Sequence, residues 1–176
     1  MDDIEILAPE FSKGVRLESR KGNRIPTLRR DPMIPEILKA ANQTHRDSFP
    51  NIETRSLDSS YNCAGMVFAF RRAWIEPKHI PRLLEEDEYL EVKRDNTIPG
   101  DLIVYYDSND RNVVRHVGII IEKSRNIEAA DWVLRVISQW GREGEYLHCE
   151  TDVPFIYCST RVYYSEKKCD LLNKRK

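Results

Sequence analysis

The spacing of apolar residues along the chain changes near residue 99, and the two parts predict different structures. In the first part, five apolar residues recur at helical spacing: Met66, Val67, Phe70, Ala73 and Trp74. They predict the inward face of a helix that begins at Cys63 and runs to about Trp74 or Ile75. After residue 99, short apolar runs alternate with turn residues, which is typical of strands. Helices followed by consecutive short strands predict an α+β fold with an antiparallel sheet.

Turn residues and prolines divide the rest of the chain. Residues 1–34 read as an irregular arm with a short strand near Val15–Leu17, and residues 45–60 read as a loop. Further helices are predicted at residues 35–42 and, as an acidic helix on the surface, at 80–88. Strands are predicted at residues 102–106, 113–121, 131–140, 155–157 and 161–164. The domain expected from these elements covers residues 58–166, with an N-terminal arm and short helix (1–57) packed on it and a basic tail (167–176).

Composition excludes several classes of function. The chain has 176 residues and a formal net charge of -1, so no overall field recruits nucleic acid. No apolar run approaches the roughly 20 residues of a membrane span, and the acidic start does not resemble a secretory signal. We therefore expect a cytoplasmic protein, or one exported without a cleavable signal peptide. The four cysteines lack metal-binding spacing, so we expect reduced thiols and neither metal nor cofactor.

Cys63 is the first candidate for chemistry. A polar, turn-prone run at residues 58–60 leads into the cysteine, which places a thiol in the first turn of the predicted helix. Unpaired N–H groups and the helix dipole favour the thiolate at such a position. His116, at the start of a predicted strand, is the candidate base, because a thiol and an imidazole on facing elements can form a reactive pair. Gly118 points the same way as His116 and would leave room beside the ring.

Three blocks of sequence carry a family resemblance. They are Asn62-Cys63-Ala64-Gly65, Pro99-Gly100-Asp101-Leu102-Ile103-Val104-Tyr105 and His116-Val117-Gly118-Ile119-Ile120. In this order and spacing they resemble the NlpC-type branch of the papain-like cysteine peptidases and amidases, and the related CHAP amidases. The resemblance implies a cysteine-bearing helix packed on an antiparallel sheet, with the histidine on one strand and a third polar residue on the next.

The resemblance also implies roles for particular residues. Cys63 would be the nucleophile and His116 the general base of a hydrolase acting on a peptide or amide-bearing substrate. Ser138 or Gln139, which face opposite ways, would orient the imidazole. The backbone N–H of Cys63, with Tyr61, would hold the oxyanion.

Other residues have less specific predictions. Asn62 precedes the nucleophile and is a candidate for substrate binding. His148 is either a rim histidine or part of the substrate pocket, and Asp101 is expected to satisfy N–H groups in its own turn. Wall peptidases of the family commonly carry Asp and Ser where this chain has Asn62 and Ala64, which removes the argument for a peptidoglycan stem peptide.

Two other functions fit the same residues. One is a papain-like binding or regulatory module without turnover, and the other is an acyltransferase that uses the same thiol and base. The oligomeric state stays open. The hydrolase interpretation requires the sulfur and the imidazole to be neighbours in an accessible groove.

Overall fold

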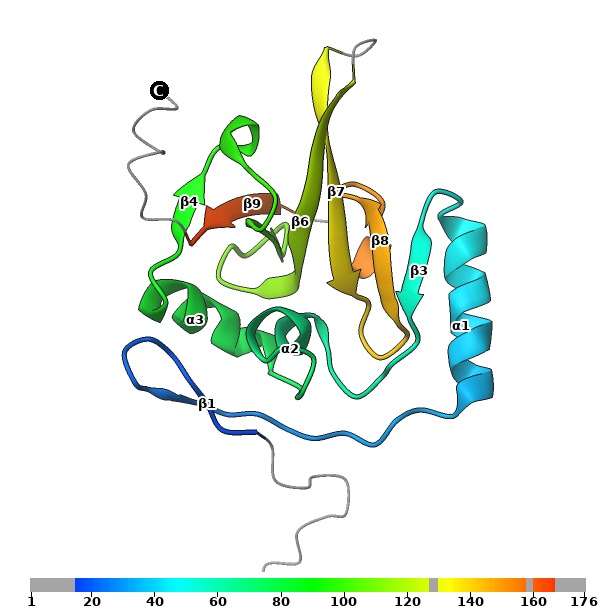
Figure 1. Cartoon of the computed structure of the whole chain (residues 1–176), viewed down its shortest axis with the longest axis horizontal. Coiled ribbons are helices and arrows are strands. Elements are labelled where there is room, and N and C mark those ends of the chain that lie inside the picture. Colours follow the sequence, from blue (N-terminus) through cyan, green and yellow to red (C-terminus); the bar gives the residue numbers. More distant parts are fainter. Residues whose placement is uncertain (1–14, 127–129, 158–159, 167–176) are drawn as a thin grey trace, which may run out of the picture.

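The strands join in one large antiparallel sheet in the computed structural model, which describes residues 15–126, 130–157 and 160–166 (Figure 1). Among the described residues this sheet has seven strands in the order β3-β8-β7-β6-β5-β9-β4. Their bounds are β3 (Glu53–Ser56), β4 (Leu90–Val92), β5 (Leu102–Tyr106), β6 (Val114–Asn126), β7 (Asp131–Gln139), β8 (Glu145–Cys149) and β9 (Thr160–Ser165). The predicted α+β class with an antiparallel sheet is confirmed.

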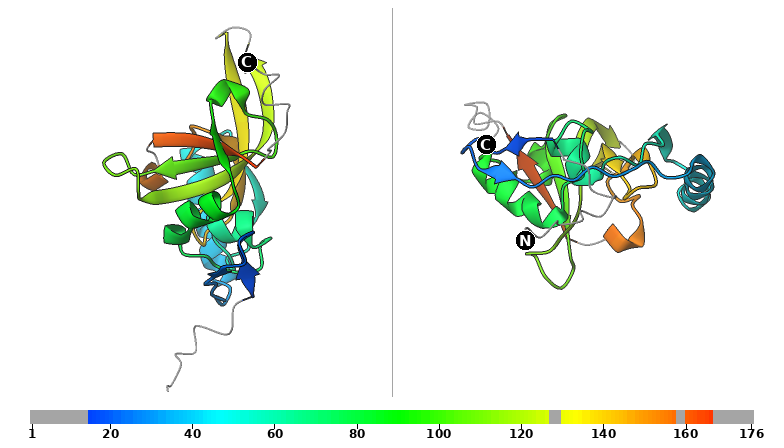
Figure 2. Two further views of the ribbon diagram at one scale, coloured as in Figure 1. Left: turned by 90° about the vertical axis from the view of Figure 1, so that its left-hand side faces the viewer. Right: turned by 90° about the horizontal axis from the view of Figure 1, so that it is seen from below.

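Three α-helices accompany the sheet within the described ranges. They are α1 (Pro35–Ser48), α2 (Cys63–Phe68) and α3 (Ile80–Glu86). Short 3-10 turns form η1 (Pro77–His79), η2 (Arg94–Asn96) and η3 (Phe155–Tyr157), and β1 (Leu17–Glu18) pairs with β2 (Arg24–Ile25). Figure 1 and Figure 2 show α1 at one end of the molecule, whereas α2 lies near the middle and α3 lies next to it, on the side away from α1.

The interior strand β5 is buried on both faces, which explains its unbroken apolar sequence. Leu102 and Val104 belong to the cluster that contains Cys63 and the buried side chains of α3. Ile103 and Tyr105, which alternate with them, belong to a second cluster on the other face. The sheet therefore separates two apolar cores, and residues of β6 contribute to both.

The helix predicted from Cys63 to about Trp74 or Ile75 ends at Phe68. Phe70 and Arg71 have φ of 51° and 63°, in the left-handed region, so the chain reverses there. The returning segment packs so closely that a Cβ on Gly65 would lie 1.8 Å from the Ala73 carbonyl oxygen. The apolar residues after Phe68 are thus buried by a reversed loop instead of a longer helix.

Several other predicted boundaries are wrong. Helix α1 continues to Ser48 and β3 follows it, so the predicted loop at 45–60 contains regular structure. Because β3 pairs with β8, the sheet extends into residues predicted as an arm. The strands β4 and β8 were not predicted, and residues 155–157 form η3 instead of a strand.

Helix α3 is not merely a surface helix, because Ile80, Leu83 and Leu84 are buried. The predicted tail at 167–176, with Cys169, lies outside the described residues, as does Cys158. Within the described part of the chain, no helix has the length and apolar composition needed to cross a bilayer.

Candidate functional site

The start of α2 is fixed by Asn62. Its Oδ1 accepts hydrogen bonds from the Gly65 N–H at 2.9 Å and the Ile75 N–H at 3.2 Å, and its Nδ2 donates to the Ile75 carbonyl at 2.7 Å. The side chain therefore caps the helix and also holds the returning segment after it. These contacts account for a buried asparagine at this position. The predicted role in substrate binding would compete with them.

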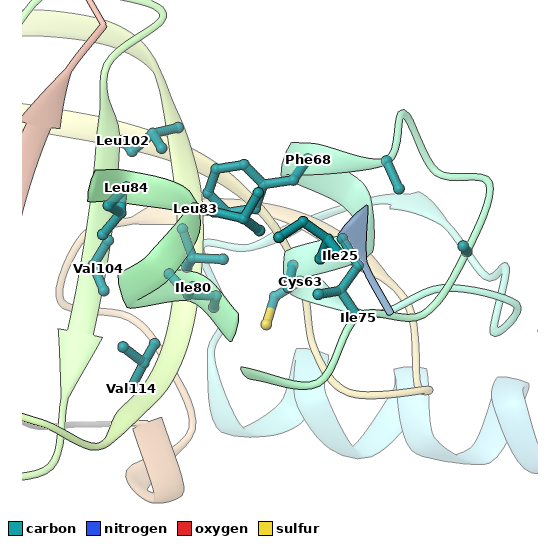
Figure 3. Close-up of a cluster of buried hydrophobic side chains, with 14 of the residues drawn as sticks. Ile25, Cys63, Phe68, Ile75, Ile80, Leu83, Leu84, Leu102, Val104 and Val114 are labelled. Atoms are coloured by element: carbon teal, nitrogen blue, oxygen red, sulfur yellow. The ribbon is translucent and has the colours of Figure 1, made fainter. Parts of the chain in front are cut away.

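Cys63 begins α2 as the sequence predicts, but it does not lie in an open groove. The residue is 6% exposed and packs among apolar side chains that include Ile75 and Ile80 (Figure 3). Burial raises the pKa of the thiol to about 11, and the backbone N–H groups of Val117, Ala64 and Cys63 act in the opposite direction. Desolvation exceeds the effect of the helix terminus, so the resting group is a neutral thiol.

The sulfur meets the sheet between β6 and β7. Helix α2 packs on both strands. Within the described pairs, the β6–β7 ladder begins only at Ile119 and Ile137, so Val117 has no partner on β7. The influence of the Val117 N–H on the Cys63 pKa places this donor beside the sulfur. Cys63 therefore lies where the two strands stop pairing.

His116 is the residue before Val117 and points to the opposite face of β6. Its ring stacks on Tyr157 with the centroids 4.2 Å apart and the planes at 15°, and it also contacts Tyr105, its partner on β5. The residue is fully buried. Burial, and to a smaller extent the charge of His148, lowers the pKa of the imidazole well below its ordinary value. The ring is therefore neutral at pH 7, the form that accepts a proton.

Neither ring nitrogen of His116 has a hydrogen-bond partner within the described part of the chain. No hydrogen bond thus joins the imidazole to Cys63, Ser138 or Gln139. The expected neighbouring pair in an accessible groove is not observed, because Cys63 and His116 are buried on opposite faces of β6. A fully buried imidazole with both nitrogens unsatisfied is unusual in native proteins and calls for an explanation.

Both candidates for orienting His116 have other partners. The Ser138 hydroxyl lies 2.7 Å from Nε2 of His148 and accepts a hydrogen bond from the Trp140 indole at 3.1 Å. His148 Nδ1 donates to the Cys149 carbonyl at 2.7 Å, so the neutral ring accepts from Ser138 through Nε2. Gln139 donates from Nε2 to the Asp58 carbonyl at 2.8 Å. Ser138 would have to exchange these contacts to reach His116. The Oε1 of Gln139 is buried without a hydrogen-bond partner in the described chain, but it does not contact the imidazole either.

His148 lies inside the protein, so it is not a rim histidine. It is 1% exposed, and burial lowers its pKa to about 4. The space beside Gly118 is also filled, because a Cβ there would lie 2.5 Å from Val136 Cγ1 and 3.2 Å from Ser138 Cβ. The glycine allows β6 to approach β7 closely and does not open room next to the imidazole.

Tyr61 is directed toward a buried carboxylate. Its hydroxyl donates to Glu145 at 3.1 Å, and Arg71 donates to the same carboxylate at 2.7 and 3.1 Å. Burial raises the pKa of Tyr61 to about 12, and Glu145 adds to the effect. The hydroxyl that was predicted to assist the oxyanion is thus part of a structural network.

Tyr157 is the site residue that the sequence analysis missed. It covers the ring of His116, and its pKa is raised by burial and next by the charge of Cys63, so it lies near both groups. It sits in η3 after Phe155 and Ile156, which are 89% and 71% exposed. The sequence holds no signal for this contact, because only the tertiary structure brings residue 157 to β6.

Asp101 behaves as predicted, since its Oδ2 accepts the Ile98 N–H at 2.8 Å within the turn before β5. Among the described residues, no group of three His, Cys, Asp or Glu side chains is arranged to hold a metal ion. Comparisons of this chain with protein-family models, curated proteins and solved structures find no match.

Proposed function

We propose that this chain is a cysteine hydrolase of the papain-like class, in which Cys63 and His116 react and Tyr157 closes the site at rest. The observation that carries the proposal is His116, a neutral and fully buried base without a hydrogen-bond partner in the described chain. It neighbours the strand position whose N–H lies beside the Cys63 sulfur. A structural core histidine would normally have its ring nitrogens satisfied.

The proposed reaction starts from the neutral pair. As the Cys63 sulfur bonds to the carbonyl carbon of an amide or ester, its proton passes to the imidazole of His116. The imidazolium then returns this proton to the leaving amine or alcohol as the carbon–leaving-group bond breaks. Water then attacks the thioester carbonyl and gives a proton to His116. The imidazolium returns this proton to the Cys63 sulfur as the carbon–sulfur bond breaks. The backbone N–H groups of Cys63 and Val117 are the donors available to the oxyanion.

Access to the pair requires movement of Tyr157. The phenol ring stacks on the imidazole, and Cys63 and His116 face opposite sides of β6, so both Tyr157 and this part of β6 must shift before the sulfur and the ring can share a proton. Movement of η3 would also admit water, and hydration would reverse the pKa shifts that burial causes.

A papain-like module without turnover is the second candidate. The observation in its favour is the thiol pKa of about 11, which leaves almost no thiolate at neutral pH in the closed arrangement. Such a module would keep the scaffold and the buried cysteine but never expose them to an acyl substrate.

Acyl-enzyme formation separates the two candidates. The full chain is incubated with an activated acyl ester at pH 7.5, and the adduct is located by peptide mass spectrometry. Hydrolase function predicts an acyl adduct on Cys63 that turns over, is absent from Cys63→Ala, and persists in Cys149→Ser. Cys149 is the matched control because it is the other free cysteine among the described residues and is less buried. Acylation of Cys149 alone, or of neither residue, supports the module.

A further inference from the structure

A charged pocket lies beside the segments that precede and follow α2. It has a volume of about 460 Å³, in the range of small-molecule sites. Its walls come from Val15, from residues 29–32 between β2 and α1, from Ser60 before α2 and from Arg71 and Arg72 after α2. Four arginines line it together with one carboxylate: Arg29, Arg30, Arg71, Arg72 and Asp31. This concentration of positive charge contrasts with a chain whose formal net charge is -1.

Two of the arginines are held in place by the protein. The guanidinium of Arg30 lies 4.1 Å from the centroid of the Trp74 ring, and its Nε is buried without a hydrogen-bond partner in the described chain. Arg71 is fixed by Glu145, which is 2% exposed in its side chain. Fixing a guanidinium in advance reduces the conformational entropy lost when an anion binds.

The guanidinium groups of the other two arginines are not neutralised by a carboxylate of the described chain. Arg29 and Arg72 form no ion pair with any carboxylate in the described ranges, and Arg72 is exposed. Arg142 supports the wall that residues 29–32 form, since its guanidinium donates to the Asp31 carbonyl at 2.5 Å. The pocket thus combines preorganised and unpaired guanidinium groups around one hollow.

We propose that this pocket binds a small molecule through a phosphate group. Planar guanidinium groups match the geometry of phosphate oxygens and form paired charge-assisted hydrogen bonds with them. Asp31 and the Ser60 hydroxyl lie in the same lining and suit hydroxyl groups on the rest of the ligand. The proposal does not depend on Cys63 chemistry.

Calorimetric titration of the full chain with inorganic pyrophosphate, at fixed ionic strength, tests the proposal. We expect saturable binding at one site, weakened about tenfold by Arg72→Gln, because one charge-assisted hydrogen bond is lost. Arg30→Gln should weaken it similarly. Arg71→Gln is unsuitable, because it would leave the buried Glu145 without its cation.

The matched control is Arg111→Gln, an exposed arginine in the turn between β5 and β6 with no ion pair in the described chain. It should bind pyrophosphate as wild type does, and so should Cys63→Ala, which separates this site from the proposed hydrolase. Equal weakening by Arg111→Gln, no saturable binding, tighter binding of malonate than of pyrophosphate, or preferential binding of an RNA oligonucleotide would each overturn the proposal.

Discussion

The proposed reactive pair, Cys63 and His116, and the arginine pocket are built in opposite ways. Cys63 and His116 are buried in the two apolar cores on either side of β6, and burial keeps both groups neutral. The arginine pocket is open and keeps its charges. A buried pair gains reactivity only when the protein opens, whereas a preorganised charged hollow can bind a ligand without rearrangement. The difference would place the proposed cysteine chemistry under conformational control and leave the proposed anion binding available without rearrangement.

Glu145 connects the two regions, and its removal should give the largest loss of stability. Its carboxylate binds Arg71 in the pocket wall and Tyr61 ahead of Cys63. Glu145→Ala leaves the Tyr61 hydroxyl unsatisfied in a buried site, and we expect a loss of about 3 kcal/mol in the free energy of unfolding. Urea denaturation measures it. Glu145→Gln keeps an acceptor and should lose less; equal stability of the alanine variant and wild type would show that the network is not needed.

Replacement of Asn62 should cause the second-largest loss of stability, because its side chain contacts only α2 and the segment that returns after it. Asn62→Ala removes the cap of α2 and leaves the backbone of Ile75 without its partner. We expect a loss of about 2 kcal/mol in the free energy of unfolding. Asn62→Asp keeps both accepted hydrogen bonds and should recover part of the loss. If the two variants unfold at the same urea concentration, the accepted bonds at Gly65 and Ile75 carry little stability.

Acid should destabilise the folded protein through His116 and His148, two buried histidines of the sheet. Both pKa values are lowered by burial, so the unfolded chain binds more protons than the folded one below pH 6.5. The contribution of the two neutral histidines to the free energy of unfolding is fully present above that pH and falls as the pH decreases. Each histidine removes at most about 1.4 kcal/mol per pH unit. The contribution of His148 stops growing near its folded pKa of about 4.

His116→Phe isolates one of these contributions. Phenylalanine keeps an aromatic ring against Tyr157 but cannot be protonated. The difference in unfolding free energy between pH 7.5 and pH 5 should therefore shrink by about 1 to 2 kcal/mol relative to wild type. An unchanged pH dependence would mean that His116 is hydrated or already protonated in the folded protein.

The sequence predicted those features that depend on local chemistry. The start of α2 at Cys63 follows from the polar run before it, and the turn at Asp101 follows from its own carboxylate. The apolar run at residues 102–106 predicted β5. In each case the residues that decide the structure lie within a few positions of one another.

Features that depend on distant contacts were not predictable. The reversal after Phe68 requires the close contact of Gly65 with Ala73, and neither residue is a helix terminator by itself. The partner of Ser138 is His148 because β7 and β8 pair in one register, which the sequence does not specify. The arginine pocket joins residues from four parts of the chain, so no single motif marks it.

The most direct test of the account is the rate at which iodoacetamide labels Cys63 between pH 6 and pH 11, measured by peptide mass spectrometry. In wild type the rate should stay low at pH 7 and rise toward the thiol pKa of about 11. Tyr157→Ala should increase the rate at pH 7 about a hundredfold, because hydration and His116 then favour the thiolate. His116→Phe in the Tyr157→Ala background should remove most of this gain. A Cys63 rate that is the same with and without His116, in the open variant, would contradict the proposed pair.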